Sequence, residues 1–510
     1  MDKNTIYAVV LSMGFLVAWW FFFQPKPQQI VTRTPGTEAV APAVRTPELK
    51  HPGPLTSKSK DIQEKEIIVE TNSYKAVFTT RGAAVKHWFV KEHNGSVVDL
   101  VMADSTPLAT FPGLNYTTAG AKDGKIVFTA QPDRGLKVIK TYELSDNYLH
   151  NLTIKTIASS REMPATELIW DGGISTDDRE KQENPKLIRV LGFTSAKPNE
   201  IEVLKKAGDF AAASYKWFAV DNRYFLSAFI MDKDGGFESA NVTREKGKQP
   251  VLTLNGRKTP AGTEQTCSLS FYLGPKGHAH LKSIGLELEE AVDFGWFGFL
   301  GKLVLKALTF LYGITQNYGW AIVILTIGLQ LIVLPLSLKS FQASIAMKKL
   351  QPHIKELQVK FKGEPQRLNA EMMNLYKTKK VNPLGGCLPM LLQLPIFWAL
   401  FTTLRNAYEL RGASWLLWVK DLSAPDTLIR IAGLPINILP LVMGAGMFLQ
   451  QKMMGVSTDP AQEKMMYLMP IIFTFIFWNF PSGLVLYWLI NNILSLSEQY
   501  YLMKKDAATA

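Results

Sequence analysis

Six long apolar runs limit the possible folds of this chain more than any other feature of its sequence. Most have close to the twenty residues that an α-helix needs to cross about 30 Å of hydrocarbon. The run at 466–480 is short and rich in Met, so a buried or re-entrant helix is the alternative there. The sequence predicts a multi-pass α-helical membrane protein with six spans. The runs cover residues 5–23, 318–338, 386–404, 431–450, 466–480 and 484–502.

The N-terminal run is predicted to be an uncleaved anchor, residues 1–23. It ends in Trp19-Trp20-Phe21-Phe22-Phe23, and no Ala-x-Ala cleavage site follows it. Residues 24–60 contain seven prolines and few large apolar side chains. A segment of this composition is expected to be an extended, disordered linker.

Basic residues between the second and third runs predict the orientation of the chain. The range 339–380 contains ten Lys or Arg against three Glu. Short loops rich in Lys and Arg remain on the cytoplasmic side of a membrane. With six spans, both termini are then cytoplasmic, as are the loop at 451–465 and the tail at 503–510. Residues 24–290 and a loop at 405–430 lie outside.

The formal net charge of +12 does not require a nucleic-acid partner. Residues 24–60 carry six basic and two acidic side chains, and the segment at 339–380 contributes a further +7. Beside a membrane, each Lys or Arg gains about 1 kcal/mol from anionic lipid. We therefore predict contact with the lipid bilayer and no specific nucleic acid.

Residues 61–290 show the alternation of short β-strands, for example in Glu66-Ile67-Ile68-Val69-Glu70, with turn signals such as Asn94-Gly95. This pattern predicts a large antiparallel sandwich. Its histidines are scattered, and His278-x-His280 is better explained as a polar turn than as a metal site. Cys267 and Cys387 are too far apart in the predicted topology to form a disulfide. We expect no enzyme activity, metal or other cofactor.

Two amphipathic segments adjoin the second span. Residues 291–312 combine aromatic side chains with Lys302 and Lys306, which is typical of a helix lying in the membrane interface. In the segment 339–385, Met347, Leu350 and Ile354 begin a spacing of three and four that predicts a cytoplasmic helical hairpin. Its lysines either form a solvated surface or contact lipid headgroups, ribosomal RNA or a nascent chain. They are Lys348, Lys349, Lys355, Lys360 and Lys362.

Two motifs carry a family resemblance: VNPLGGCLPMLLQLPIF at 381–397 and FPSGLVLYW at 480–488. They resemble the YidC family of membrane protein insertases, in the Gram-negative form with a large periplasmic domain. The resemblance implies a bacterial inner-membrane protein with a five-helix core bundle and a periplasmic β-supersandwich. It also implies an insertase and chaperone that acts on nascent membrane proteins through a hydrophilic groove. Such a protein works alone or with the Sec translocon and its accessory proteins, and the ribosome is a further candidate partner.

Polar residues within the predicted spans are the candidate groove lining. Each of them could instead make an ordinary interhelical hydrogen bond, worth about 0.6 kcal/mol. The candidates are Thr326, Gln330, Gln393, Trp488, Asn491 and Asn492. The family pattern has an arginine five residues before a Pro-Leu pair, and here Gln330 precedes Pro335-Leu336 at that spacing. Arg405 is a candidate substitute charge, with an interfacial arginine as the alternative.

A channel or secondary transporter is the alternative function. We expect no carboxylate within the spans for ion coupling, and the two halves of the chain show no evident repeat. No Walker A pattern is present to use ATP. These features favour the insertase over the transporter.

Overall fold

The computed structural model describes residues 64–92, 95–133, 135–175, 187–195, 200–382, 388–431, 433–454 and 460–509. The predicted anchor at 1–23, the predicted linker at 24–60 and Cys387 lie outside these residues. The described residues divide into two compact units. One contains Ala346–Pro383, and the other contains Pro52–Ile345 and Leu384–Ala510.

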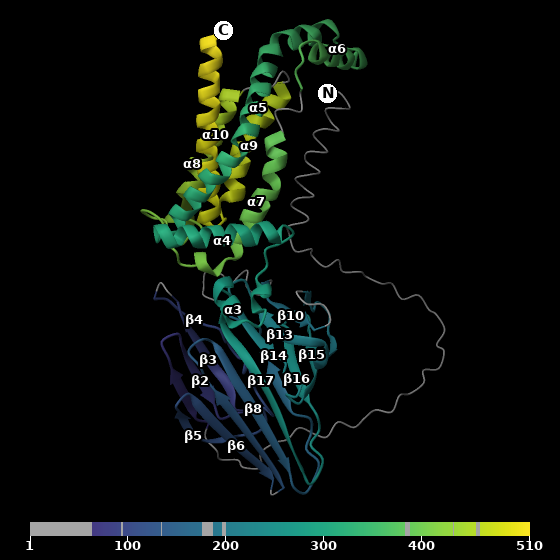
Figure 1. Ribbon diagram of the computed structural model, residues 1–510, viewed down its shortest axis with the longest axis vertical. Helices are drawn as coiled ribbons and strands as arrows, with labels where there is room; N and C mark the ends of the chain where they lie inside the picture. Colours follow the sequence, from purple (N-terminus) through teal and green to yellow (C-terminus); the bar gives the residue numbers. More distant parts are fainter. Residues whose placement is uncertain are drawn as a thin grey trace, which may run out of the picture. The chain divides into compact units, whose positions relative to one another are not determined.

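The larger unit contains a β-rich domain with three antiparallel sheets among its described residues (Figure 1). One four-stranded sheet has the order β1 (Glu66–Glu70), β2 (Tyr74–Thr79), β3 (Ala84–Lys91), β4 (Val97–Asp99). The nine-stranded sheet has the order β11 (Ile201–Val203), β10 (Arg189–Thr194), β13 (Tyr215–Asp221), β14 (Phe225–Ile230), β17 (Thr263–Pro275), β8 (Leu149–Ala158), β7 (Leu136–Glu143), β6 (Lys125–Asp133), β5 (Thr117–Lys122). The third sheet has the order β12 (Gly208–Ala211), β15 (Phe237–Thr243), β16 (Val251–Gly256), β9 (Glu167–Trp170).

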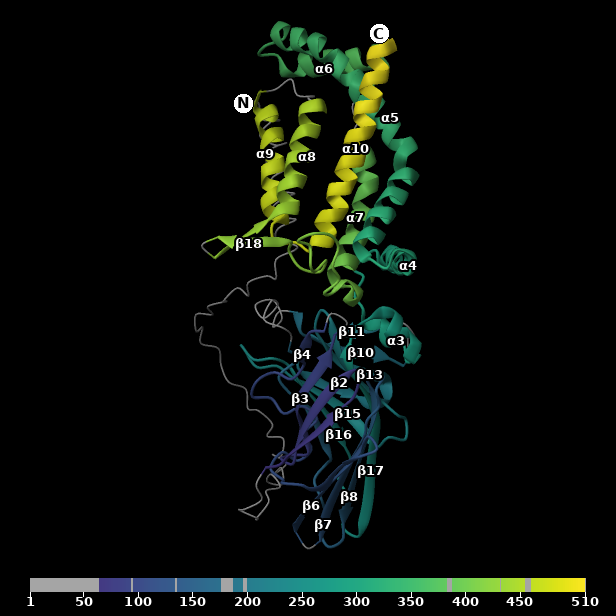
Figure 2. The same ribbon diagram turned by 90° about the vertical axis from the view of Figure 1, so that its left-hand side faces the viewer.

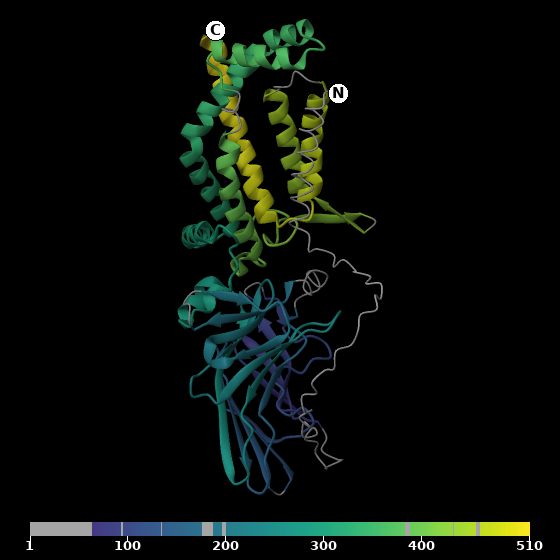
Figure 3. The same cartoon turned by 90° about the vertical axis from the view of Figure 1, so that its right-hand side faces the viewer.

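Aromatic side chains join these sheets around one core. The rings of Phe78 on β2 and Tyr142 on β7 have centroids 4.8 Å apart. Trp170 on β9 lies 5.8 Å from Phe229 on β14. Both four-stranded sheets therefore pack against the nine-stranded sheet, whose long strand β17 is prominent in Figure 3. Alternate residues of the central strands are buried here, as the period of two in a strand requires.

Two short helices cover the other face of the nine-stranded sheet. They are α3 (His278–Ile284) and the 3-10 helix η2 (Leu288–Ala291). Leu281 and Leu288 belong to the same buried cluster as Trp217 and Tyr272 of the sheet. His278 and His280 thus lie in a helix rather than in the expected turn. Two further 3-10 helices are η1 (Ala212–Ser214) and η4 (Tyr408–Leu410).

Apolar helices follow this domain. Length and hydropathy alone mark two described helices, α4 and α5, as able to cross a membrane, and Lys464–Phe477 as a shorter apolar helix. The bounds are α4 (Gly298–Thr315), α5 (Tyr318–Lys360), α6 (Pro365–Thr378), α7 (Leu388–Asn406), α8 (Ile438–Met454), α9 (Pro460–Phe477) and α10 (Ser482–Thr509). Helix α9 begins before the predicted span at 466–480, and α10 continues through most of the predicted tail at 503–510.

Helix α4 lies crosswise to α7 (Figure 1) and packs against it. Its buried residues Gly301, Val304, Leu305 and Leu308 form one face. The opposite face exposes large apolar side chains, Phe299, Leu303, Phe310 and Ile314. The helix begins seven residues later than expected, at Gly298 rather than 291, because residues 292–297 form a bend and a turn after η2, with Gly295 at a φ of +69°.

Side-chain caps fix the starts of α5 and α8. Gln316 adopts a left-handed φ of +54° that ends α4, and the Asn317 side chain then accepts the Trp320 N–H at 3.2 Å. The Asp426 carboxylate accepts the N–H groups of Ile438 and Leu439 at 2.9 and 2.7 Å.

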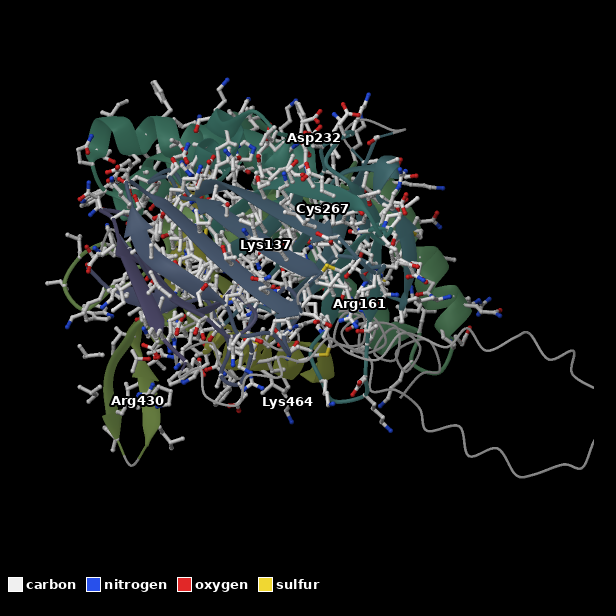
Figure 4. All side chains as sticks on the ribbon, turned by 90° about the horizontal axis from the view of Figure 1, so that it is seen from below. Lys137, Arg161, Asp232, Cys267, Arg430 and Lys464 are labelled. Carbon is white, nitrogen blue, oxygen red and sulfur yellow. The ribbon has the colours of Figure 1, made fainter. Side chains whose placement is uncertain are left out.

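A β-hairpin precedes α8. Strand β18 (Thr427–Ile431) pairs antiparallel with β19 (Leu434–Asn437) around Gly433, whose φ is +83°. The prediction that a helix begins at 431 is therefore wrong. A proline disfavours the helical conformation at the residue before it, so Pro435 favours an extended Leu434. The β-branched residues of β18 also favour a strand. Arg430 lies on this hairpin in Figure 4.

Helix α10 lies between α7 and the α8–α9 pair (Figures 2 and 3). One buried cluster contains Leu404 of α7, Met443 of α8, Phe477 of α9 and Leu486 of α10. This cluster forms the core of the helical part of the larger unit.

The smaller unit contains the end of α5 and helix α6, joined by residues 361–364. Gly363 has a φ of +96°, and Pro365 starts α6, where its missing N–H costs nothing. Leu350 and Ile354 are buried. The five candidate lysines, Lys348, Lys349, Lys355, Lys360 and Lys362, are exposed.

Candidate functional site

Gln330 and Glu498 connect α5 to α10. The Gln330 Nε2 donates to both carboxylate oxygens of Glu498, at 3.1 and 3.3 Å. Gln330 is 8% exposed, and Glu498 is half-buried. No ion pair to Glu498 is present among the described residues.

A second polar contact connects α7 to α10. The Gln393 Nε2 donates to the Tyr487 hydroxyl at 2.5 Å. Tyr487 is buried, whereas Gln393 is half-buried. Side chains of α10 thus accept hydrogen bonds from one side-chain amide on each of two other helices, α5 and α7.

Other polar side chains of α5 and α10 are buried, and they have few hydrogen-bond partners among the described residues. Thr326 is 2% exposed, and its hydroxyl donates to the Ile322 carbonyl of its own helix at 2.7 Å. The Asn492 Nδ2 and the Gln499 Oε1 have no hydrogen-bond partner in the part of the chain that the structure describes. Asn491 is half-buried.

Trp488 contacts aromatic residues rather than the amides. Its ring lies 5.0 Å from Phe397 of α7 and 5.3 Å from Phe477 of α9. Its indole Nε1 is buried without a partner among the described residues. Trp488 therefore forms part of the packing between three helices.

Arg405 lies at the far end of α7 from Gln393. Twelve residues separate them, which is about 18 Å along a helix. The Arg405 guanidinium lies over the Phe401 ring at 5.7 Å, and the Arg405 carbonyl accepts the Tyr224 hydroxyl at 3.2 Å. The structure does not bring Arg405 to the polar residues that join α7 and α10.

The residues that the sequence reasoning missed are Glu498, Gln499 and Tyr487. Glu498 lies inside the run 484–502, so the expectation of no carboxylate within the spans is wrong. A charge at the centre of a span costs about 2.5–3.5 kcal/mol on the insertion scale, and Glu498, four residues before the end of the run, has a smaller cost that one amide partly offsets. A signal was present, because Glu498 follows Asn491 by seven residues and so shares its helix face.

Metal binding finds no support here. The described residues contain no group of three or more His, Cys, Asp or Glu side chains able to hold a metal ion. The described hydrogen-bond partner of the Glu498 carboxylate is the amide of Gln330. The arrangement can exchange hydrogen bonds with polar groups or water, and it contains one carboxyl group.

Two family models match the chain. The 60Kd inner membrane protein model matches residues 310–509, and the YidC periplasmic domain model matches residues 103–307. A membrane protein insertase YidC from Endomicrobium trichonymphae is 49% identical over 518 positions, covering 100% of this chain and 99% of the relative. The chain belongs to the YidC family of membrane protein insertases.

Two further comparisons are with another YidC sequence and with a solved YidC structure. A membrane protein insertase YidC from Geotalea uraniireducens strain Rf4 is 34% identical over 544 positions, covering 99% of each chain. The crystal structure of an active YidC insertase with its first transmembrane domain resolved is 21% identical, with a TM-score of 0.40 over 86% of this chain and 93% of that one.

Membership of the YidC family confirms the resemblance and the insertase function drawn from the two motifs. It also confirms that the β-rich domain is periplasmic and that the protein is a membrane protein. Within the YidC pattern, Gln330 stands where the resemblance implies an arginine. The structure gives that glutamine an acidic partner on α10.

Proposed function

We propose that this protein inserts nascent membrane proteins through a polar groove formed by α5, α7 and α10. The Gln330–Glu498 contact carries the proposal, because it places an amide and a carboxylate together between two apolar helices. The groove residues we propose are Thr326, Gln330, Gln393, Asn491 and Asn492, with Trp488 as an aromatic wall and Glu498 as an added member.

The groove lowers the cost of moving the polar tail of a substrate into the bilayer. An unpaired polar group in hydrocarbon costs several kcal/mol, and the amides of Gln330 and Gln393 offer hydrogen bonds in its place. The apolar span of the substrate then passes into lipid, which provides about 25 cal/mol for each Å² of apolar surface removed from water. This transfer needs no nucleotide.

Exposed apolar side chains support contact between these helices and lipid. On α5, Leu331 and Ile332 are 62% and 76% exposed, and Phe475 on α9 is 71% exposed. Large apolar side chains of this exposure fit a hydrocarbon environment. They also provide a surface along which a substrate helix can leave.

We further propose six spans, with both termini cytoplasmic and residues 24–290 periplasmic, in the bacterial inner membrane. In this arrangement α5, α7, α8, α9 and α10 form the five-helix core, and α4 lies in the outer interface. The end of α5 and α6 then form a cytoplasmic hairpin. Its exposed lysines contact lipid headgroups or a translating ribosome, and the Sec translocon is a further proposed partner.

Replacing Gln330 tests the groove. Gln330→Leu in proteoliposomes should reduce insertion of a single-span substrate with a polar tail more than one with an apolar tail, because leucine offers no hydrogen bond. Gln330→Arg should retain insertion. The matched control is Gln342→Leu, which makes the same change at an exposed position of the same helix.

A silent Gln330→Leu together with a disruptive Gln330→Arg would place residue 330 outside the groove. The same vesicles, loaded with a small fluorescent solute, separate the insertase from a channel. Solute release without insertion would favour the channel.

A further inference from the structure

Glu498 is a carboxylate within an apolar helix, and its described partner is neutral. Both of its oxygens face one Gln330 amide nitrogen. A carboxylate has about four sites at which it can accept hydrogen bonds, and this amide fills at most two. The neutral amide does not cancel the charge of an ionised carboxylate, and the remaining acceptor sites are open to another donor.

A second observation is that polar groups of α10 lack hydrogen-bond partners among the residues that the structure describes. The Asn492 Nδ2 is an unfilled donor and the Gln499 Oε1 an unfilled acceptor, on side chains of residues that are 8% and 2% exposed. These two residues are seven apart, so they lie on one face of the helix. Buried polar groups are nearly always hydrogen-bonded, so this stretch of α10 has polar atoms that a group beyond the described residues can complete.

We propose that Glu498 makes this protein select polar tails that carry cationic groups over tails that carry acidic ones. The inference rests on the proposed groove and names the substrate class that the groove prefers. A lysine ammonium brings three donors and a positive charge to the open sites of the carboxylate. A tail carboxylate meets a like charge there and has no donor to offer.

Gln330 is a positioning residue in this arrangement. Its amide orients the carboxylate without cancelling the charge. An arginine at position 330 would form an ion pair with Glu498 and leave no net charge for a substrate to sense. The selectivity therefore depends on the combination of a neutral residue on α5 and an acidic residue on α10.

The test uses the full chain in proteoliposomes without a membrane potential, so that the applied field does not sort the tails. Three N-acetylated substrates share one apolar span and differ only in a short tail with two Lys, two Ser or two Asp. The unmodified protein should insert the Lys tail best and the Asp tail least. Glu498→Gln should shrink the Lys-to-Asp ratio about three- to tenfold, the effect of one charge a few ångströms away in a hydrated site.

A charge exchange provides the sharper readout. Gln330→Arg should also shrink the ratio, and Gln330→Arg combined with Glu498→Gln should reverse it in favour of the Asp tail. The matched control is Glu371→Gln, which removes one exposed carboxylate from α6 and should leave the ratio unchanged. The Ser tail reports general activity for every variant, and reversal of the order is not a result that simple misfolding can produce.

The outcomes separate the two proposals. If the unmodified protein inserts none of the three substrates, the proposed groove function fails. If it inserts the Ser tail well but shows no Lys-to-Asp difference, or if the double variant keeps the original order, the charge selectivity is overturned and the groove function stands.

Discussion

The ion pair between Glu92 and Arg411 connects the β-rich domain to the segment that follows α7, and its loss should be costly. The Arg411 Nε lies 2.6 Å from the Glu92 Oε1, and the two side chains are only 2% and 4% exposed. The guanidinium also lies over the ring of Tyr224 at 5.0 Å. Because neither charge reaches solvent, screening does not reduce the interaction.

Arg411→Met keeps most of the apolar stem and removes the charge. Glu92 is then left buried without its cation, which destabilises a structure by about 3–5 kcal/mol. Replacing both residues, as Glu92→Leu with Arg411→Met, should restore most of that stability, since no buried charge remains. The control is Lys125→Met at the exposed Lys125–Glu143 pair, where about 1 kcal/mol or less is expected.

Native-state hydrogen exchange measures the effect locally. Amides in residues 404–422 should exchange roughly a hundred- to several-thousand-fold faster in Arg411→Met, since each 1.36 kcal/mol is about tenfold. The double variant should exchange at nearly the original rate. If Arg411→Met exchanged no faster than Lys125→Met, the carboxylate of Glu92 would not depend on the Arg411 cation, and the reasoning would be refuted.

Two further predictions concern orientation and pH. In intact cells, and with Cys387 replaced by Ser, an impermeant maleimide should label Lys137→Cys on β7 but not Lys360→Cys, and labelling at 360 from outside would overturn the topology. Cys267 should stay unlabelled throughout, because burial among the strands (Figure 4) raises the pKa of its thiol to about 11. Burial lowers the pKa of His150 from 6.5 to about 3. Between these two pH values the imidazole is neutral in the folded domain, whereas it binds a proton in the unfolded chain. The stability of the domain is then fully present above about pH 6.5 and is lost as the pH falls, by about 2 kcal/mol at pH 5. His150→Phe should flatten the fall in Tm between pH 7 and 5, and an unchanged slope would contradict this.

Local periodicity explains what the sequence predicted well. The alternation along strands such as β7 records which side of the sheet is buried, so the antiparallel layers could be expected without knowing their order. The start of α5 could also be expected, because Thr315-Gln316-Asn317 interrupts two apolar segments and Asn317 caps the second. The start of α8 could not, because hydropathy does not separate the apolar strands β18 and β19 from the helix that follows.

The contacts between helices could not be predicted from the sequence of one helix, because they depend on how separate helices pack together. Gln330 and Gln393 were both recognised as polar residues in apolar runs, but their partners on α10 are set by how the helices pack. Tyr487 belongs to the FPSGLVLYW motif, and the structure shows that its hydroxyl accepts a hydrogen bond from the Gln393 amide. Trp488, in contrast, lies in an aromatic contact with Phe397 and Phe477.

Glu498 was missed because hydropathy averaged over a run of twenty residues conceals one charge. The charge that Glu498 presents to a substrate depends on the residue at position 330 more than on its own place in α10. With an arginine at 330, Glu498 would be neutralised and the two helices would share a closed ion pair. With Gln330, the same carboxylate is held in place by hydrogen bonds at 3.1 and 3.3 Å from a neutral amide. A change from cation to amide on α5 therefore does more than remove a positive charge. In the selectivity that we propose, it gives the carboxylate on α10 the role that the arginine on α5 would otherwise have.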